Sequence, residues 1–519
     1  MAFSFSRDRW REYIAKRTTD FSAKVYKDGD RVYTVDSDGK TMAEGEAGVD
    51  DASVIQAALD SLTAGRTWKE KVVLKGDFVI NSSILVPSCT ILDCREAQLK
   101  LPSNADYPVL KNKNYGNFDE EIKIVGGVFD GNNNTFDTAK ALIDITGGDA
   151  VDTHCKNIIV EGVKVVNIDG TGDGVGIWLR RVTKSKVLFC WAENCKNGIS
   201  VEGTHNYGSE ISHCIALNNK ASGIVPGLSH GMVVSSNVVM GNGNNGISCD
   251  SSHRIIVRDN FCASNSNHGI AIFTSIGDAP EYATVEGNIV WNNGGRGISI
   301  NPAPYCVVEG NFIYGNDHDG LYVGGNSKGS QIIGNKVMLS GYDGIRLYDA
   351  HNSIIEANTC LNNGQAGSGY SGIYLENYVN SCVVVGNRCY DDQSTKTQDY
   401  GISIGGSCTY VTVKHNVVRA NKVQGIYITS TGVVYVFGND GYLTENSGTA
   451  TFSGDGSTTQ FSIEHGLVST PSKVQVTAMS SDAAGDFYVT ADATYIYVNY
   501  KTAPPSGTDN IKLSWSAEV

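Results

Sequence analysis

The chain has 519 residues, which is too long for one hydrophobic core, and combines 59 glycines with 18% charged residues and a net charge of −14. That composition is typical of a long, turn-rich β protein. It argues against a nucleic-acid partner, which needs clustered Lys and Arg. No apolar run approaches the ~20 residues of a membrane-spanning helix, and the first residues show no apolar signal-peptide core.

The first segments in chain order predict an arm and a cap. Residues 1–45 are expected to form an N-terminal arm and a hairpin-rich leader. Residues 51–63, "DASVIQAALDSLT", space Val54, Ile55, Ala58 and Leu59 as on one face of a helix. Asp51 is a suitable helix cap. A helix here would cover the open first coil of a solenoid.

The middle of the chain is a repeat. A Gly-(Ile/Leu)-x-apolar unit recurs at steps of 22 to 29 residues. Each unit holds two or three short alternating strands between Gly and Asn turns, and it cannot bury its own apolar face. We therefore predict an all-β fold, a right-handed parallel β-helix over residues 46–440. The unit begins at Gly176, Gly198, Gly223, Gly246, Gly269, Gly297, Gly320, Gly344, Gly372, Gly401 and Gly425.

Asparagines repeat in phase with the glycines, each closing an apolar strand. Stacked in register they would form a hydrogen-bonded ladder at a turn, so we interpret them as structural. The 13 cysteines include no CxxC pair, and we expect free, buried thiols. The asparagines are Asn237, Asn260, Asn288, Asn311, Asn335, Asn358, Asn387 and Asn416.

After Gly425 the repeat stops. Residues 446–519 contain about six short strands with turn residues every 8–12 positions, which predicts a small C-terminal β-sandwich.

Two stretches carry a family resemblance. "GVDDASVIQAALDSL" with "KVVLKGDFVINSSILVPSCTILD" resembles the start of the pectate-lyase-like superfamily. The rungs "NFCASNSNHGIAIFTS" and "NIVWNNGGRGISI" resemble those of mannuronan C5-epimerases and periplasmic-copper-type β-helix repeats. The resemblance implies the β-helix fold and a polysaccharide partner, neutral or anionic. It does not choose among hydrolase, lyase, epimerase and binding protein.

The epimerase signature, Tyr-Gly-Phe-Asp-Pro-His with an Asp on the next rung, is not matched. In "GISVEGTHN" Ser200 and Glu202 replace its Asp and His, and Pro226 replaces the second Asp. The C-terminal module resembles the small terminal domains of viral tail fibres. That likeness implies a location outside the cell or on a virion surface, and a homotrimer is one assembly it suggests.

A functional groove on a β-helix is a column of residues at one phase of successive rungs. The position before each Gly-Ile carries His268, Arg296, Asp319 and Asp343 on consecutive rungs. Neighbouring outward positions carry Tyr322, Arg346, Tyr348, Tyr374 and Glu376. Tyrosine rings contact sugars, and arginine pairs with carboxylate or sulfate.

These columns predict a catalytic set of Asp319, Asp343, Glu376 and His268. Asp319 and Asp343 lie one rung apart, a backbone step of ~4.8 Å, close to the carboxyl spacing of a retaining glycosidase. Glu202 and Asp250 lie two rungs apart, ~9.6 Å, and form a second pair with the spacing of an inverting enzyme. The substrate-binding set is Arg296, Tyr322, Arg346, Tyr348, Tyr374, Glu202 and Asp250.

Several readings stay open. Hydrolysis by paired carboxylates is slightly preferred, while His268, Arg296, Arg346 and Tyr348 would also suit a lyase or epimerase. A glycan-binding spike without catalysis is a third class. Asp before Gly is also a common turn residue. We expect no metal at His318, and Ca²⁺ at "DGNNNTFD" (130–137) is an alternative to a stacked Asn/Asp turn.

Overall fold

The computed structural model describes residues 21–169, 174–275 and 279–519. Its contacts divide the chain into two units, one ending at Gly341 and one running from Tyr342 to Val519, and each is described by itself. The fold is nearly all-β, a right-handed parallel β-helix of about 15 turns with small antiparallel sheets at the C-terminus, as the repeat predicts. The expected arm before residue 21 lies outside the described residues.

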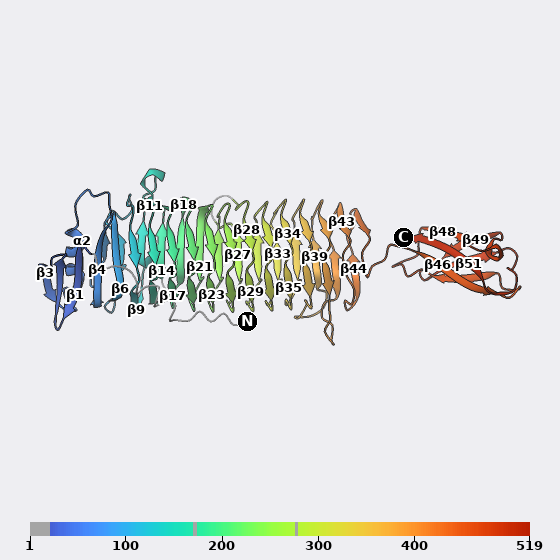
Figure 1. Cartoon of the computed structure of the whole chain (residues 1–519), viewed down its shortest axis with the longest axis horizontal. Helices are drawn as coiled ribbons and strands as arrows, with labels where there is room; N and C mark the ends of the chain where they lie inside the picture. The colour runs from blue at the N-terminus through green and yellow to red at the C-terminus, as the bar shows by residue number, and fades with distance from the viewer. Residues whose placement is uncertain (1–20, 170–173, 276–278) are drawn as a thin grey trace. The chain divides into compact units, whose positions relative to one another are not determined.

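The first unit begins with an antiparallel meander and a helix. Strands β1 (Ala23–Asp28), β2 (Arg31–Asp36) and β3 (Thr41–Glu46) form the meander, and β1 also pairs in parallel with β4 (Glu70–Val79). Helix α2 (Asp51–Asp60) buries the predicted apolar face and contacts all four strands (Figure 1, blue).

Asp51 has a different role from the one we expected. The N-cap residue is Asp50, and Asp51 is the first helical residue. Its buried carboxylate accepts hydrogen bonds from the backbone N–H of Gly48 at 3.0 Å and of Val79 at 2.7 Å, and pairs with Lys27 Nζ at 2.8 Å. Asp51 therefore ties the helix to strands β1 and β4, because three donors converge on one buried charge.

The coils of the first unit stack their strands in register. One sheet, which we call the front sheet, has its strands joined in parallel from one coil to the next (Figure 1, green to yellow). Its strands are β5 (Ile84–Val86), β7 (Leu110–Asn112), β10 (Lys140–Thr146), β14 (Gly174–Arg180), β18 (Asn197–Tyr207), β21 (Ile224–His230), β24 (Ile247–Asp250), β27 (Ile270–Phe273), β30 (Ile298–Asn301) and β33 (Leu321–Val323).

The other sides of each coil carry short strand pairs, which also stack in parallel. Valine and isoleucine at their central positions point inward and are buried, as β-branched side chains favour. The first unit includes β6 (Thr90–Lys100), β8 (Lys123–Val125), β9 (Val128–Thr135), β12 (Ile159–Glu161), β13 (Lys164–Asp169), β16 (Lys186–Leu188), β17 (Trp191–Glu193), β19 (Glu210–Ser212), β20 (Ile215–Leu217), β22 (Val233–Ser235), β23 (Val238–Met240), β25 (Ile256–Arg258), β26 (Phe261–Ala263), β28 (Thr284–Glu286), β29 (Ile289–Trp291), β31 (Val307–Glu309), β32 (Phe312–Tyr314), β34 (Gln331–Ile333) and β35 (Lys336–Met338).

The repeated glycine has a steric cause. A Cβ on Gly246 would lie 2.6 Å from the carbonyl oxygen of Gly269 on the next coil, and one on Gly297 would lie 2.5 Å from that of Gly320. Real side chains do not tolerate such contacts. The Gly-Ile unit therefore repeats because successive coils approach too closely for a side chain.

The asparagine ladder forms as predicted within each unit. Asn288 Nδ2 donates to Asn311 Oδ1 at 2.9 Å, and Asn311 repeats the bond to Asn335 at 2.9 Å. A second buried ladder, which we did not predict, joins Asn219, Asn242, Asn265, Asn293 and Asn316 at 2.8 to 2.9 Å. Asn316, the last asparagine in this series, is 1% exposed.

All 13 cysteines are buried and free, as expected from their positions in apolar strands. Burial raises the pKa of the Cys306 thiol to about 12. These thiols therefore act as small apolar side chains. The helix in the described part of the chain is too short and too polar to cross a membrane.

The second unit contains further coils and an antiparallel module. The coils place β36 (Ile345–Tyr348), β39 (Ser371–Glu376), β42 (Tyr400–Ile404) and β44 (Gln424–Ile428) in one parallel sheet. Their other sides carry β37 (Ile354–Glu356), β38 (Thr359–Leu361), β40 (Val383–Val385), β41 (Arg388–Tyr390), β43 (Val411–Lys414) and β45 (Val434–Phe437).

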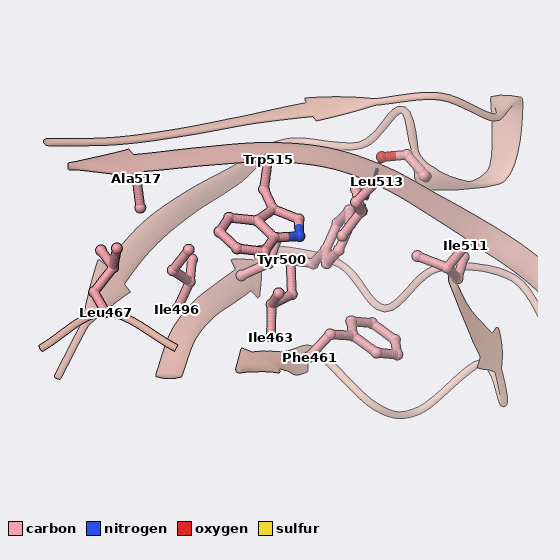
Figure 2. Close-up of a cluster of buried hydrophobic side chains, with 11 residues drawn as sticks. Phe461, Ile463, Leu467, Ile496, Tyr500, Ile511, Leu513, Trp515 and Ala517 are labelled. Carbon is pink, nitrogen blue, oxygen red and sulfur yellow. Dashed lines mark hydrogen bonds between the residues drawn. The ribbon is translucent and has the colours of Figure 1, made fainter. Parts of the chain in front are cut away.

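The C-terminal module is built from two three-stranded antiparallel sheets. Their inner faces share a core that includes Phe461, Tyr500 and Trp515 (Figure 2). The strands are β46 (Glu445–Gly454), β47 (Gln460–Glu464), β48 (Lys473–Ala478), β49 (Phe487–Ala491), β50 (Tyr495–Tyr500) and β51 (Gly507–Glu518).

The ladder makes a testable contribution to stability. We expect Asn311→Ala to destabilise the fold by roughly 1–3 kcal/mol, because it leaves buried ladder donors without partners. Thermal unfolding followed by circular dichroism measures the change. Asp317→Ala, at an exposed position of the adjacent turn, is the matched control. Equal unfolding temperatures for the two variants would contradict a stabilising ladder.

Candidate functional site

The front sheet of the first unit brings Glu202 and Asp250 into one column. Glu202 on β18 lies beside Gly227 on β21, and Gly227 lies beside Asp250 on β24. The two carboxylates are therefore two coils apart, the spacing that the repeat predicts, and Gly227, which the sequence analysis did not single out, lies between them. A Cβ on Gly227 would lie 3.1 Å from Glu202 Cγ. The glycine therefore leaves a gap between the two acids that any side chain would fill.

The two carboxylates have contrasting surroundings. Burial raises the pKa of Glu202, and the charge of Asp250 acts in the same direction; Ser200, Trp178 and Arg180 oppose the rise without cancelling it. Asp250 instead accepts a hydrogen bond from the backbone N–H of Ser275 at 2.8 Å. The hydroxyl groups of Ser251 and Ser275 also donate to it. Glu202 is thereby suited to hold a proton, whereas the Asp250 carboxylate is held by hydrogen bonds from Ser251 and Ser275.

A charged cluster borders Glu202 on the preceding coils. Arg180 on β14 is the register partner of Glu202 on β18. Its guanidinium forms an ion pair with the fully buried Asp144 at 3.1 Å. The Tyr115 hydroxyl donates to Asp144 at 3.2 Å. The Arg180 guanidinium carbon lies 4.0 Å from the centre of the Trp178 ring. This end of the site is rigid, because each of these groups is held by another.

The predicted column at His268, Arg296 and Asp319 is also assembled. Asp319 is 1% exposed and accepts a hydrogen bond from Arg296 Nε at 3.0 Å. The Arg296 guanidinium carbon lies 3.6 Å from the centre of the Tyr322 ring, and Tyr322 is only 7% exposed. Tyr322, which we predicted to face a sugar, is thus largely covered.

His268 is held neutral in this column. Burial, aided by the charges of Arg296 and His318, lowers the pKa of His268 to about 4. Its Nδ1 accepts a hydrogen bond from the backbone N–H of Arg296 at 3.0 Å. In a neutral imidazole with an accepting Nδ1, the other nitrogen carries the proton. His268 therefore presents a donor to its surroundings rather than a base.

The remaining predicted residues lie in the second unit. Arg346 Nε donates to Glu376 at 2.9 Å, and the guanidinium carbon lies 5.6 Å from the Tyr374 ring centre. Asp343 is 2% exposed and accepts a hydrogen bond from the backbone N–H of Ser371 at 2.7 Å. Tyr348 is 37% exposed. Asp319 and Asp343 belong to different units, and their pairing stays a prediction.

In the segment 130–137, proposed above as an alternative calcium site, the carboxylate of Asp130 already has hydrogen-bond partners. Asp130 accepts hydrogen bonds from the backbone N–H of Asn132 at 2.8 Å and from Asn167 Nδ2 at 3.1 Å. Lys100 Nζ lies 3.6 Å away. Within residues 21–169, 174–275 and 279–519, no three His, Cys, Asp or Glu side chains gather closely enough to hold a metal ion.

Two family models match the chain. One is described as a right handed beta helix region and matches residues 275–441; the other is described as periplasmic copper-binding protein (NosD) and matches residues 132–300. The chain is a right-handed parallel β-helix protein. No curated protein sequence matches it at a significant level.

Several solved structures share the β-helix fold. The tailspike protein of Escherichia coli bacteriophage HK620 in complex with a pentasaccharide is 14% identical, with a TM-score of 0.59 over 99% of this chain and 100% of that one. A double mutant of that tailspike gives a TM-score of 0.61 over 93% and 92%, also at 14% identity. The mannuronan C-5 epimerase AlgE6 A-module of Azotobacter vinelandii is 16% identical, with a TM-score of 0.44 over 76% and 96%.

Some residues of this β-helix site escaped the sequence reasoning. Gly227 stands in no motif, and only its register with Glu202 and Asp250 shows its importance. Trp178 lies two positions after the repeat glycine Gly176, but the sequence alone does not place it beside Ser200 and Arg180. Tyr115 lies outside the repeat, so no periodic pattern places it beside Asp144. Aligning every coil by its Gly-Ile unit would have found the first two.

The raised pKa of Glu202 predicts a pH-dependent cost to stability. Above the unfolded-state value of about 4.3, the unfolded chain ionises Glu202 more easily than the folded chain does, so folding is penalised. We expect Glu202→Gln to raise the unfolding temperature at pH 7 by about 1–4 °C. The gain should vanish as the pH falls well below 4, where both states hold the proton.

Glu210→Gln is the matched control with the opposite sign. Burial acts to raise the pKa of Glu210, but hydrogen bonds from Lys186 and Ser212 outweigh it, and the pKa is lowered overall. Its ionised form therefore stabilises the fold at pH 7, and this stabilisation is lost as the pH falls. Glu210→Gln should lower the unfolding temperature at pH 7. A loss of stability at pH 7 in both variants would refute the assigned state of Glu202.

Proposed function

We propose that this β-helix protein binds a polysaccharide along the front sheet of its first unit and hydrolyses it between Glu202 and Asp250. The observation that carries the proposal is the column Glu202–Gly227–Asp250. Two coils correspond to ~9.6 Å of backbone, which suits the roughly 6.5–9.5 Å between the carboxyl groups of inverting glycosidases. The bound pentasaccharide of the phage tailspike supports the choice of substrate class.

The reaction assigns one role to each acid. Glu202 gives its proton to the glycosidic oxygen as the bond from that oxygen to the anomeric carbon breaks. Asp250 takes a proton from the water that attacks the anomeric carbon on the opposite face. The products are two shorter chains with one new reducing end. Exchange with solvent then returns the proton to Glu202 and removes it from Asp250.

The surroundings favour this pair over the other predicted carboxylates. Asp319 and Glu376 are each engaged by an arginine, Arg296 and Arg346. Each of these ion pairs occupies carboxylate oxygens that a substrate would have to reach. His268 offers no free lone pair for proton abstraction in its present tautomer. A lyase or epimerase reaction using His268 as the base would first need that hydrogen bond to break.

A binding function without catalysis is the second candidate, and the second unit favours it. The rings of Tyr400 and Tyr427 stack with centres 4.5 Å apart, and Tyr427 is 39% exposed. Tyr374 and Arg346 lie on neighbouring strands of the same sheet. Tyrosine and arginine side chains on one face suit contact with sugar rings and their acidic substituents.

The resemblance of the C-terminal module to viral tail-fibre terminal domains also suggests where the protein is located and how it assembles. We place the protein outside the cell or on a virion surface, and a homotrimer stays a prediction. Apolar side chains exposed near the last coil support self-association, because such surfaces are usually covered. They include Tyr435 at 53%, Phe437 at 41% and Val433 at 42%.

The reaction class is tested with a panel of neutral and acidic polysaccharides. We expect reducing ends to appear without absorbance growth near 235 nm, which would mark β-elimination. Glu202→Gln and Asp250→Asn should each lower kcat at least a hundredfold, because general acid–base catalysis contributes about 10²–10⁴.

Asp319→Asn and Asp343→Asn are the matched comparison. If those two lose turnover while Glu202→Gln and Asp250→Asn keep it, the active site lies in the other column. Growth of the absorbance near 235 nm would show that the reaction is an elimination and not a hydrolysis. Proton NMR of a mannuronan reveals an epimerase. Binding of a panel member without any reaction in the wild type would establish the non-catalytic alternative.

Gly227 gives a second test that leaves both acids in place. Its φ lies outside the left-handed region, so alanine fits the backbone, and the three atoms nearest the new Cβ all belong to the Glu202 side chain. We expect Gly227→Ala to fold normally and to lose at least tenfold in kcat, since the methyl group fills the gap between the acids. Gly448→Ala, also at an ordinary φ, is the control. Full turnover in Gly227→Ala would contradict the site.

A further inference from the structure

Two buried donors beside Glu202 have no hydrogen-bond partner among the described residues. They are the indole Nε1 of Trp178 and the Oγ of Ser200, and Ser200 is 0% exposed. Leaving a buried donor unpaired is unfavourable, so a native structure rarely keeps two together without a reason. Their position suggests the reason.

The strand register places both donors two residues before the paired positions Arg180 and Glu202. Trp178 on β14 pairs directly with Ser200 on β18, just as Arg180 pairs with Glu202 two residues later. Residues two apart on a strand face the same side of the sheet. Both donors favour the ionised form of Glu202, yet neither meets the geometry of a hydrogen bond with it. They are near the carboxyl but not bonded to it.

The groups packed around Glu202 hold these donors in place. On the preceding coil Arg180 stacks on the Trp178 ring at 4.0 Å and is itself fixed by Asp144 at 3.1 Å. On the following coil Gly227 contributes no side chain. One coil further, the negative charge of Asp250 opposes ionisation of Glu202. Because Arg180 already restricts the indole, a hydrogen bond from its N–H to the carboxyl costs little further conformational entropy.

We infer that Trp178 and Ser200 are positioning residues that bond to Glu202 when its carboxyl is ionised and stay unpaired while it is protonated. Hydrogen bonds to a carboxylate are about twice as strong as those to a neutral group, so both donors gain most after the proton has left. No proton moves from either donor. The proton of Glu202 goes to the glycosidic oxygen, and the two N–H and O–H bonds stabilise the charge that remains.

The inference makes proton release from Glu202, and hence the pH range of activity, depend on this donor pair. It rests on the proposed function only in taking Glu202 as the acid. The first test uses no substrate, because the fluorescence of an indole changes when its N–H gains a charged acceptor. The emission of Trp178 should therefore report ionisation of Glu202 in the free protein.

The experiment follows tryptophan emission of the full chain from pH 3.5 to pH 8.5. We expect one transition above the ordinary glutamate range in the wild type. It should disappear in Glu202→Gln and in Trp178→Phe, and move to higher pH in Ser200→Ala, because one stabilising bond is lost. Trp191→Phe is the control, since Trp191 Nε1 donates to Glu193 at 3.1 Å, and it should keep the transition.

Kinetics supply the second readout. Trp178→Phe and Ser200→Ala should each lower kcat about tenfold with little change in KM, and shift the basic limb of the pH profile upward. A purely structural role would lower the unfolding temperature and leave that limb in place, which overturns the inference. So does a wild-type transition that persists in Glu202→Gln. If the transition behaves as expected but no polysaccharide is cleaved, the donor pair stands and the hydrolase function fails.

Discussion

Register between neighbouring coils is the constraint on which the rest of this structure depends. Every coil repeats the same phase, so any residue has a counterpart about 4.8 Å above and below it. The buried asparagine ladders fix that phase, because an amide one position out of step would leave its donor and its acceptor unpaired in the core. The rung glycines fix it sterically, since their carbonyl contacts leave no room for a side chain. Polar bonds and close packing thus specify one stacking.

The same constraint builds the candidate site without a linear motif. Glu202, Gly227 and Asp250 are far apart in sequence but lie in one column because each holds the same place in its coil. A β-helix can therefore set the distance between two acids by the number of coils between them. One coil suits a covalent intermediate, and two coils leave room for a water molecule. The glycine in the intermediate coil is what keeps that room open.

The sequence predicted much of this, and the failures have physical causes. The period of the Gly-Ile unit and the phase of the asparagines predicted the solenoid and one ladder, because both depend on repetition. The second ladder was not predicted, because its member Asn316 stands in "NDHDG", which looks like a charged turn when considered alone. Asp51 was expected to cap the helix, but its carboxylate instead accepts a hydrogen bond from the backbone of β4 and pairs with Lys27. Such contacts depend on tertiary proximity, which no local pattern records.

The choice between carboxylates was the hardest part for the same reason. From the sequence, Asp319 and Glu376 were preferred as catalytic acids and Glu202 belonged to a second pair, because a column shows which residues are neighbours but not which of them form ion pairs. Arg296 pairs with Asp319 and Arg346 pairs with Glu376, so each of these acids has an arginine partner on the preceding coil.

Glu202 differs in lacking such a pair. Its nearest arginine, Arg180, is shared with the buried Asp144, and its nearest donors are unbonded. A structure that served stability alone would give that arginine to Glu202, or replace the acid with an amide. Keeping a desolvated carboxyl beside two idle donors lowers stability, and proteins tolerate such local conflicts mainly at functional sites. That conflict, more than the spacing of the acids, separates this column from the structural ion pairs elsewhere on the β-helix.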